Sequence, residues 1–164
     1  MAVNTFLKLD NVKGESTHEG FEGYVDILSY SIGVNHESSI GTRTGGMGEG
    51  KASFHDFSIV KQVDAASPVF FQMCAQGKHF EKATITFNKQ SGDAKPHKFF
   101  IHEFEEVYIT NVHWSGSAEH PTESVSFAYG SMKVTYDAQD SKGKSAGKPV
   151  GAGWHVRKNS PLGK

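Results

Sequence analysis

A glycine-rich segment, GGMGEGKA from Gly45 to Ala52, comes within one residue of a phosphate-binding loop. Such a loop binds an anion through backbone N–H groups at the start of a helix, and a Ser or Thr hydroxyl holds a magnesium ion. Here Ala52 stands where that hydroxyl would be, and it cannot bind a metal. The following segment, SFHDFSIVKQV, is typical of a β-strand rather than a helix. We therefore interpret Gly45–Ala52 as a glycine-rich connection between two strands.

Nine histidines and 18 acidic residues could in principle assemble a metal or catalytic site, but their spacing matches no such site. The HExxH pair of zinc hydrolases and the GxSxG elbow of serine hydrolases are both missing from the sequence. His55, His97 and His102 each fall within or beside an expected strand, where a single histidine is more often half-buried or exposed than a metal ligand. We therefore expect no metal site.

Three acidic residues, Glu103, Glu105 and Glu106, lie close together in an expected strand. Paired carboxylates can hydrolyse glycosides, but no spacing argument supports that chemistry here. We expect at least two of the three to point away from the core, on a solvated or interfacial face. Cys74 is the only cysteine, which excludes an intrachain disulfide and a cysteine-based metal centre. The sequence therefore predicts neither an enzyme nor a cofactor.

The composition fits a single domain that is held together by packing. The chain has 164 residues, enough to bury a core, and its 17 basic residues balance 18 acidic ones. Without a net field it should attract neither nucleic acid nor an anionic membrane. No window approaches the roughly 18 apolar residues of a membrane span, and the start lacks the features of a signal peptide. We expect a protein made in the cytoplasm that, if exported, uses a route without a cleavable leader.

Four extended segments alternate apolar and polar residues and then change phase by one residue. The apolar sets before and after each change are Val25 and Ile27, then Leu28, Tyr30, Ile32 and Val34; Ala52 and Phe54, then Phe57 and Ile59; Phe100, His102 and Phe104, then Val107 and Ile109; and Val125, Phe127 and Tyr129, then Met132, Val134 and Tyr136. A β-bulge shifts the phase in this way and lets a strand bend sharply. The pattern predicts long, bent strands with their apolar residues facing one core.

The expected fold is mainly β, a compact β-barrel of two packed, strongly bent sheets, with one short α-helix on the outside. The helix should cover Ser67 to Gln76, because Ser67 suits the N-cap, Pro68 the first turn and Gly77 the C-cap. Phe70, Met73 and Cys74 recur at helical spacing, which predicts that this face covers the β-structure and that Cys74 is a small buried apolar group.

Several segments, in order, resemble the Hcp family of type VI secretion tube proteins. They are FLKLDNVKGES, DILSYSIG, the glycine-rich loop, FSIVKQVDAASPVFFQMCAQGKHF and GWHVRKN, and they span Ala2 to about Asn159. The resemblance implies one tube domain over residues 1–159, a short tail at 160–164, and six copies that close into a ring. Rings would stack into the inner tube that a contractile sheath drives out of the cell, with spike and baseplate components as further partners. Family members also carry small effector proteins in the lumen.

Two sets of residues are assigned to this assembly. The excursion from Ser39 to Gly50 suits the stacking of rings, because glycines tolerate many backbone conformations and could be ordered by the next ring. The residues assigned to this contact are Gly41, Gly45, Gly46, Met47, Gly48, Glu49 and Gly50. Ser29 and Ser31 alternate with Leu28, Tyr30 and Ile32, so we expect them to face the ring lumen; both could instead face solvent or a neighbouring subunit. A small-ligand-binding β-barrel is the second hypothesis, and an enzyme a distant third.

Overall fold

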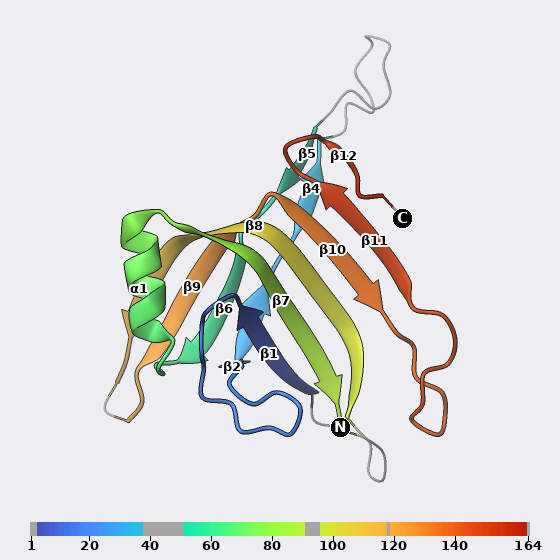
Figure 1. Ribbon diagram of the computed structural model, residues 1–164, viewed down its shortest axis with the longest axis horizontal. Coiled ribbons are helices and arrows are strands. Elements are labelled where there is room, and N and C mark those ends of the chain that lie inside the picture. The colour runs from blue at the N-terminus through green and yellow to red at the C-terminus, as the bar shows by residue number, and fades with distance from the viewer. Residues whose placement is uncertain (1–2, 38–50, 91–95, 118, 164) are drawn as a thin grey trace.

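The computed structural model describes residues 3–37, 51–90, 96–117 and 119–163 and is mainly β, as the sequence predicts (Figure 1). The strands are β1 (Val3–Leu9), β2 (Val25–Ile27), β3 (Ser29–Ser31), β4 (Val34–His36), β5 (Ala52–Phe54), β6 (Phe57–Gln62), β7 (His79–Lys89), β8 (His97–Ser115), β9 (Thr122–Ala128), β10 (Ser131–Tyr136), β11 (Val150–His155) and β12 (Ser160–Pro161), and the helix is α1 (Ser67–Gln76).

The main sheet is antiparallel and curls around one core. Its pairing runs β2–β1–β7–β8–β9–β6–β3, and only Leu28 separates β2 from β3 in the chain. The Leu28 N–H donates to the carbonyl of Val60 on β6, 2.8 Å away, so the bent segment β2–β3 links both ends of the curled sheet. Strands β10, β11 and β12 extend from β8 as a wing, and β4 and β5 form a separate two-stranded ribbon (Figure 1).

The phase changes predicted around residues 105 and 130 are confirmed, and they form one corner. Along the same edge, β8 pairs first with β10 and then with β9, the last pairs being Ser131 with Glu105 and Tyr108 with Ala128. At this handover Glu106 adopts a φ of 52°, and the N–H of Gly130 donates to the carbonyl of Glu105 over 2.9 Å. The strand therefore rotates here, which returns apolar side chains to the core on both sides of the bend.

The other two phase changes mark the ends of strands. Between Phe54 and Phe57 the chain leaves the ribbon and enters the main sheet. At the β2–β3 bend the expectation of an inward Leu28 is wrong, since 61% of this residue is exposed, and Val34 on the ribbon is also exposed. Tyr30 does lie on the core face, where its ring packs on Phe87 with 4.6 Å between centroids. The sequence cannot show which partner strand each half of the segment takes, and that choice sets the inward side.

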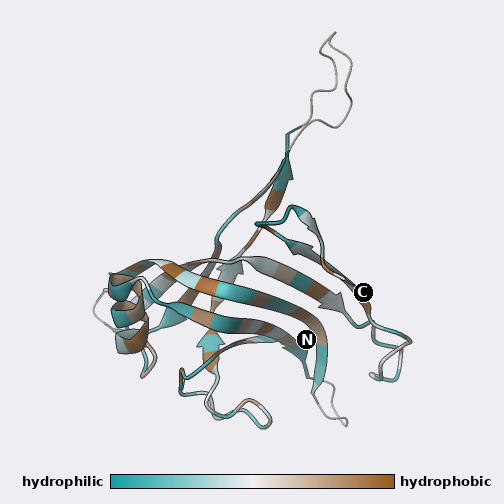
Figure 2. Cartoon of the chain, turned by 45° about the horizontal axis from the view of Figure 1, so that its top comes forward, coloured by the Kyte–Doolittle hydropathy of each residue, from teal (hydrophilic) through white to brown (hydrophobic). Residues whose placement is uncertain are grey.

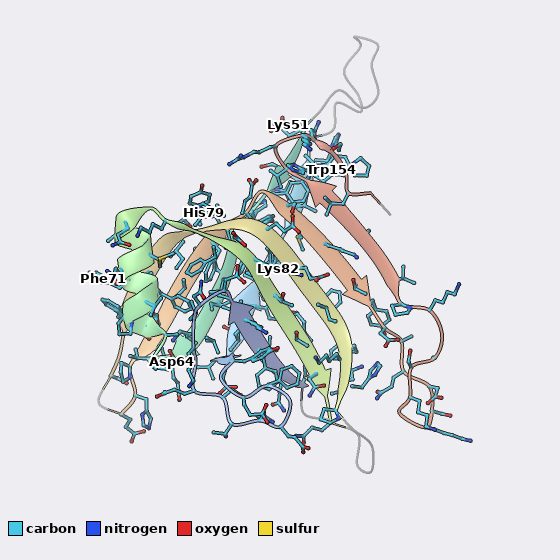
Figure 3. The ribbon with its side chains drawn as sticks, viewed as in Figure 1. Lys51, Asp64, Phe71, His79, Lys82 and Trp154 are labelled. Carbon is cyan, nitrogen blue, oxygen red and sulfur yellow. The ribbon has the colours of Figure 1, made fainter. Side chains whose placement is uncertain are left out.

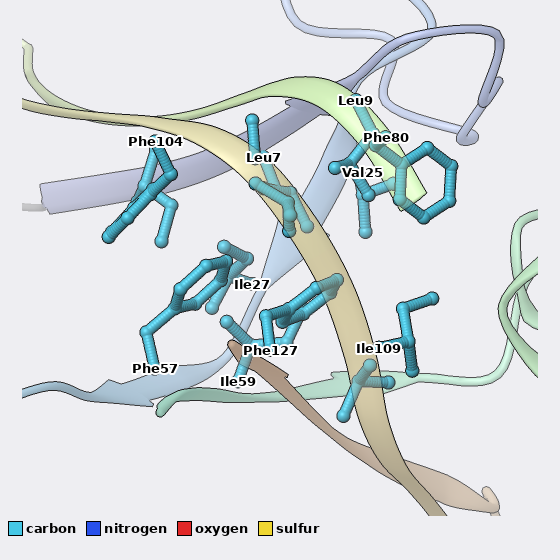
Figure 4. Close-up of a cluster of buried hydrophobic side chains, with 14 of the residues drawn as sticks. Leu7, Leu9, Val25, Ile27, Phe57, Ile59, Phe80, Phe104, Ile109 and Phe127 are labelled. Carbon is cyan, nitrogen blue, oxygen red and sulfur yellow. The ribbon is translucent and has the colours of Figure 1, made fainter. Parts of the chain in front are cut away.

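Aromatic side chains fill the interior of the curled sheet. The ring of Phe57 stacks on Phe104 and on Phe127, with centroid distances of 4.2 and 4.5 Å, and Ile59 lies fully buried beside them (Figure 4). Polar and apolar residues alternate along the long strands that surround this core (Figure 2). Burial of such large apolar side chains, at roughly 25 cal/mol per Å², supplies most of the stabilising free energy of a domain held by packing.

Helix α1 has the predicted bounds and covers the barrel through Phe70, which is buried. Gly77 is the predicted C-cap, with a φ of 63° and an N–H that donates to the carbonyl of Cys74 over 3.2 Å. The prediction of Ser67 as the N-cap is wrong, because Ala66 occupies that position without a side-chain cap. Ser67 instead lies in the first turn, where its hydroxyl forms hydrogen bonds with the Asp64 N–H and the Glu123 carboxylate.

Candidate functional site

Ser29 and Ser31 lie at the edge of a row of small polar side chains across three strands. Ser31 on β3 stands opposite Ser58 on β6, which stands opposite Ser126 on β9. Directly opposed residues share one face of a sheet, and the Ser58 and Ser126 hydroxyl oxygens are 2.8 Å apart. A second row runs from Ser29 through Val60 to Ser124. We call Ser29, Ser31, Ser58, Ser124 and Ser126 the hydroxyl face.

The hydroxyl face lies on the outer side of the sheet. Ile59 and Val125, which alternate with the serines of β6 and β9, are fully buried in the core, so the serines point the other way. Ser29 and Ser31 are exposed, and Ser58, Ser124 and Ser126 are half-buried. These hydroxyls both donate and accept hydrogen bonds and carry no charge. Such a face can bind many polar protein surfaces without strong preference.

A buried ion cluster connects α1 to the other side of the same strands. The Lys61 ammonium lies 2.9 Å from a Glu123 carboxylate oxygen and 2.7 Å from Asp64, and neither Lys61 nor Glu123 is exposed. The Ser67 hydroxyl donates to Glu123 over 2.5 Å and accepts from the Asp64 N–H over 3.0 Å. Sequence reasoning missed this cluster.

A signal for the ion cluster was present in the sequence. Lys61 follows Phe57 and Ile59 at the same inward positions of one strand, and Glu123 precedes Val125 at an inward position of another. Opposite charges at two inward positions must pair when they are buried, because an isolated buried charge costs several kcal/mol. The register places Lys61 directly opposite Glu123.

The three histidines singled out in the sequence lie in different environments. His102 is buried, and neither ring nitrogen has a hydrogen-bond partner among the described residues; burial lowers its pKa to about 4. His97 is half-buried, with Nε2 3.1 Å from the carbonyl of Asp137, and His55 is exposed. Within the described ranges, no three His, Cys, Asp or Glu side chains converge on a possible metal position.

The acidic trio points outward, as predicted. Glu103 pairs with Lys82 over 3.0 Å, Glu106 lies 3.3 Å from Arg157, and Glu105 is exposed. Exposed ion pairs of this kind contribute little free energy, about 0–1 kcal/mol each, so they mark a solvated face.

The other residues assigned from the sequence can be placed only in part. Cys74 packs against the core as an apolar group, as predicted, but it is half-buried rather than buried. The stacking residues lie outside the described part of the chain; they are Gly41, Gly45, Gly46, Met47, Gly48, Glu49 and Gly50. Strands β4 and β5 flank them and pair antiparallel from Val34–Phe54 to His36–Ala52. Among the helices of the described residues, none has the length and apolarity needed to cross a membrane.

The chain is similar to known proteins along almost its whole length. Residues 6–136 match the model of the family described as "Type VI secretion system effector, Hcp". The chain is 33% identical to protein hcp1 of Pseudomonas aeruginosa, over 97% of this chain and 98% of that protein. It superimposes with a TM-score of 0.90 on a type six secretion system protein of 29% identity, covering 98% of this chain and 100% of the other. For Hcp1 from Salmonella typhimurium the TM-score is 0.81 at 26% identity, with 99% and 100% covered. The chain therefore belongs to the Hcp family of type VI secretion proteins.

Proposed function

We propose that this protein is a structural subunit of the type VI secretion inner tube, in which six copies close into a ring and rings stack head-to-tail. Membership of the Hcp family supports this role. The surface supports it as well, because large apolar residues such as Leu28, Phe71, Trp114 and Val150 are exposed on the single chain. Exposed apolar surface of this extent is typical of a protein that is covered by partners.

The observation that carries the proposal furthest is the hydroxyl face. In a ring, Ser29 and Ser31 would line the lumen together with Ser58, Ser124 and Ser126. A small effector protein in the lumen would then meet uncharged hydroxyls, which can hydrogen-bond to it without a fixed geometry. We propose that the ring carries and stabilises small effectors in this way until the tube is exported.

The remaining partners follow from this role. Residues Gly41 and Gly45–Gly50 would form the contact between rings, and the sheath, spike and baseplate would contact the assembled tube. The subunit would be made in the cytoplasm and leave the cell through the secretion apparatus, without a cleavable signal peptide. It would bind no nucleic acid and insert into no membrane.

The packing of the barrel disfavours the alternative of a small-ligand-binding β-barrel. A ligand-binding barrel encloses a cavity, whereas the stacked rings of Phe57, Phe104 and Phe127 occupy the centre here. No contact among the described residues favours catalysis over assembly.

Electron microscopy of the purified full chain tests the proposal. We expect rings with an open centre. A Ser29→Cys variant labelled with a maleimide-coupled gold cluster should place the label inside the ring, while a Thr17→Cys variant, exchanged at an exposed loop position, should place it elsewhere. Rings that carry the Ser29 label on their outer rim would remove the lumen assignment but keep the ring.

A further inference from the structure

We propose that two surfaces on different sides of the molecule bind one another in neighbouring copies of this chain and form the lateral contact of the ring; the inference rests on the ring proposed above. The first surface is the inner side of the wing. The second is a hollow at the β2–β3 bend. Each surface combines exposed apolar side chains with charged ones. The charged residues are basic on the wing and acidic at the hollow.

The wing face is formed by three cross-strand pairs of β10 and β11. The pairs are Met132 with Trp154, Val134 with Ala152, and Tyr136 with Val150. Val34 and Phe54 of the β4–β5 ribbon cover one end and line an apolar groove of about 460 Å³ with Met132 and Trp154. The other end is open, since Tyr136 is 47% and Val150 73% exposed. An exposed apolar sheet face of this kind is typical of a surface that binds a partner.

The acidic hollow lies where β2 turns into β3. Glu15, Asp26 and Asp64 line it together with Leu28, Gln62 and Val63. Among the described residues no basic side chain lines it, although Asp64 is paired with the buried Lys61 ammonium. Leu28 is 61% and Val63 42% exposed. The hollow therefore offers an apolar centre with carboxylates around it.

The two surfaces are complementary in charge. Residues 131–163, which form the wing, carry six basic and two acidic side chains, whereas residues 3–37, which supply half of the residues that line the hollow, carry two basic and six acidic ones. Lys144 and Lys148 precede Val150 on the wing and are exposed, as are Glu15 and Asp26 at the hollow. The near-neutral net charge of the chain conceals this asymmetry, which favours a contact between unlike patches.

The two surfaces cannot meet within one molecule. Figure 3 shows Trp154 of the wing and Asp64 of the hollow at opposite sides of the barrel. A contact between them must therefore join two copies head-to-tail, and repetition of such a contact closes a ring when the rotation allows it.

The hollow is also rigid, which lowers the entropic cost of binding. The backbone of Leu28 is held by its hydrogen bond to Val60, and the N–H of Val63 donates to the carbonyl of Pro121 over 3.3 Å. Asp64 accepts from Lys61 over 2.7 Å and from the Ala66 N–H over 2.9 Å. The apolar centre is thus preorganised for a partner.

Disulfide cross-linking of the full chain tests the contact. Leu28→Cys and Val150→Cys would be combined in a Cys74→Ser background, and the protein would be oxidised and separated without reductant. Both positions are exposed, so these exchanges open no cavity. We expect a ladder of covalent species up to six subunits. Each single-cysteine variant should give no ladder, and neither should the matched control Val3→Cys with Val150→Cys, because Val3 is exposed on a different surface. The absence of cross-links from rings of the Leu28–Val150 variant would overturn the inference.

A charge exchange provides the second test. A wing variant, Lys144→Glu with Lys148→Glu, and a hollow variant, Glu15→Lys with Asp26→Lys, should each weaken ring formation by at least tenfold at low salt. An equimolar mixture should form rings again, because each altered wing can bind an altered hollow and each native wing a native hollow. The control Lys78→Glu with Lys82→Glu changes the same charge outside both surfaces and should keep the rings.

The outcomes separate this inference from the proposed function. If the wild-type chain forms no ring, the proposed function fails. Two results would show that the wild-type chain forms rings through a different lateral contact. In the first, both charge variants still form rings; in the second, the mixture of the two variants does not form rings again.

Discussion

His102 places a titratable imidazole inside the barrel. Its ring lies among Phe87, Phe100 and Phe104, with centroid distances of 5.3, 4.4 and 6.3 Å, and its cross-strand neighbours are Ile85 and Val134. Desolvation by these apolar groups disfavours the imidazolium, which lowers the pKa from 6.5 to about 4. The folded state therefore holds this side chain neutral at physiological pH.

This shift predicts a loss of stability in acid. Between pH 6.5 and about 4 the unfolded chain binds a proton at His102 and the folded chain does not, so the contribution of His102 falls as the pH falls through this window. At about 1.4 kcal/mol per pKa unit, the full loss is at most about 3–4 kcal/mol. His102→Phe should remove this part of the pH dependence. Urea unfolding at pH 4 to 7 measures it, with exposed His55→Phe as the control. Parallel pH profiles for wild type and His102→Phe would contradict the assignment.

Ser31 is an exposed residue of the hydroxyl face. Ser31→Tyr should leave the ring mass unchanged, because Ser31 is exposed, but should fill part of the lumen and reduce the small proteins that co-purify with rings. A displaced contact of about 1.4 kcal/mol lowers binding tenfold. Mass spectrometry of purified rings measures the bound proteins, and Thr17→Tyr, exposed on another loop, is the control. An unchanged amount of co-purified small proteins would mean that Ser31 does not contact them.

Among the elements, the sequence predicted the alternating segments of β8, β9 and β10 and the bounds of α1. It treated β2–β4 and β5–β6 as single segments and did not predict the ion cluster that links α1 to the strands. Alternation and capping residues are local signals, so β8, β9 and the helix could be assigned from their own residues. Leu28 was misassigned because the inward side of β2 and β3 depends on their partners β1 and β6, which local pattern does not reveal. The pairing of Lys61 with Glu123 depends on the same non-local register.

The ion cluster predicts an asymmetric response to mutation. Lys61→Met leaves the Glu123 carboxylate buried without its cation and should lower the free energy of unfolding by about 3–5 kcal/mol. The double variant Lys61→Met with Glu123→Leu should recover at least half of that loss, because both charges are gone. Denaturant unfolding measures both, and Lys82→Met, at an exposed pair, should change little. A double variant less stable than Lys61→Met would show that the pair stabilises the fold by itself.

For the whole molecule, deletion of the glycine-rich loop should distinguish the formation of single rings from the stacking of rings. Deletion of Gly45–Gly50 should keep single rings, since the loop is assigned to axial contacts, but should shorten or abolish stacks. Electron microscopy at high protein concentration would count rings per stack for wild type and variant. If the rings themselves were lost, the loop would have to be assigned to the lateral contact between subunits instead.

We expect further copies of this chain to cover its exposed apolar surfaces. Sedimentation equilibrium over a wide concentration range measures the mass without labels or mutations. A ring of six 17.9 kDa chains should appear as a species near 107 kDa that persists on dilution. A single species at 17.9 kDa across all concentrations would contradict it.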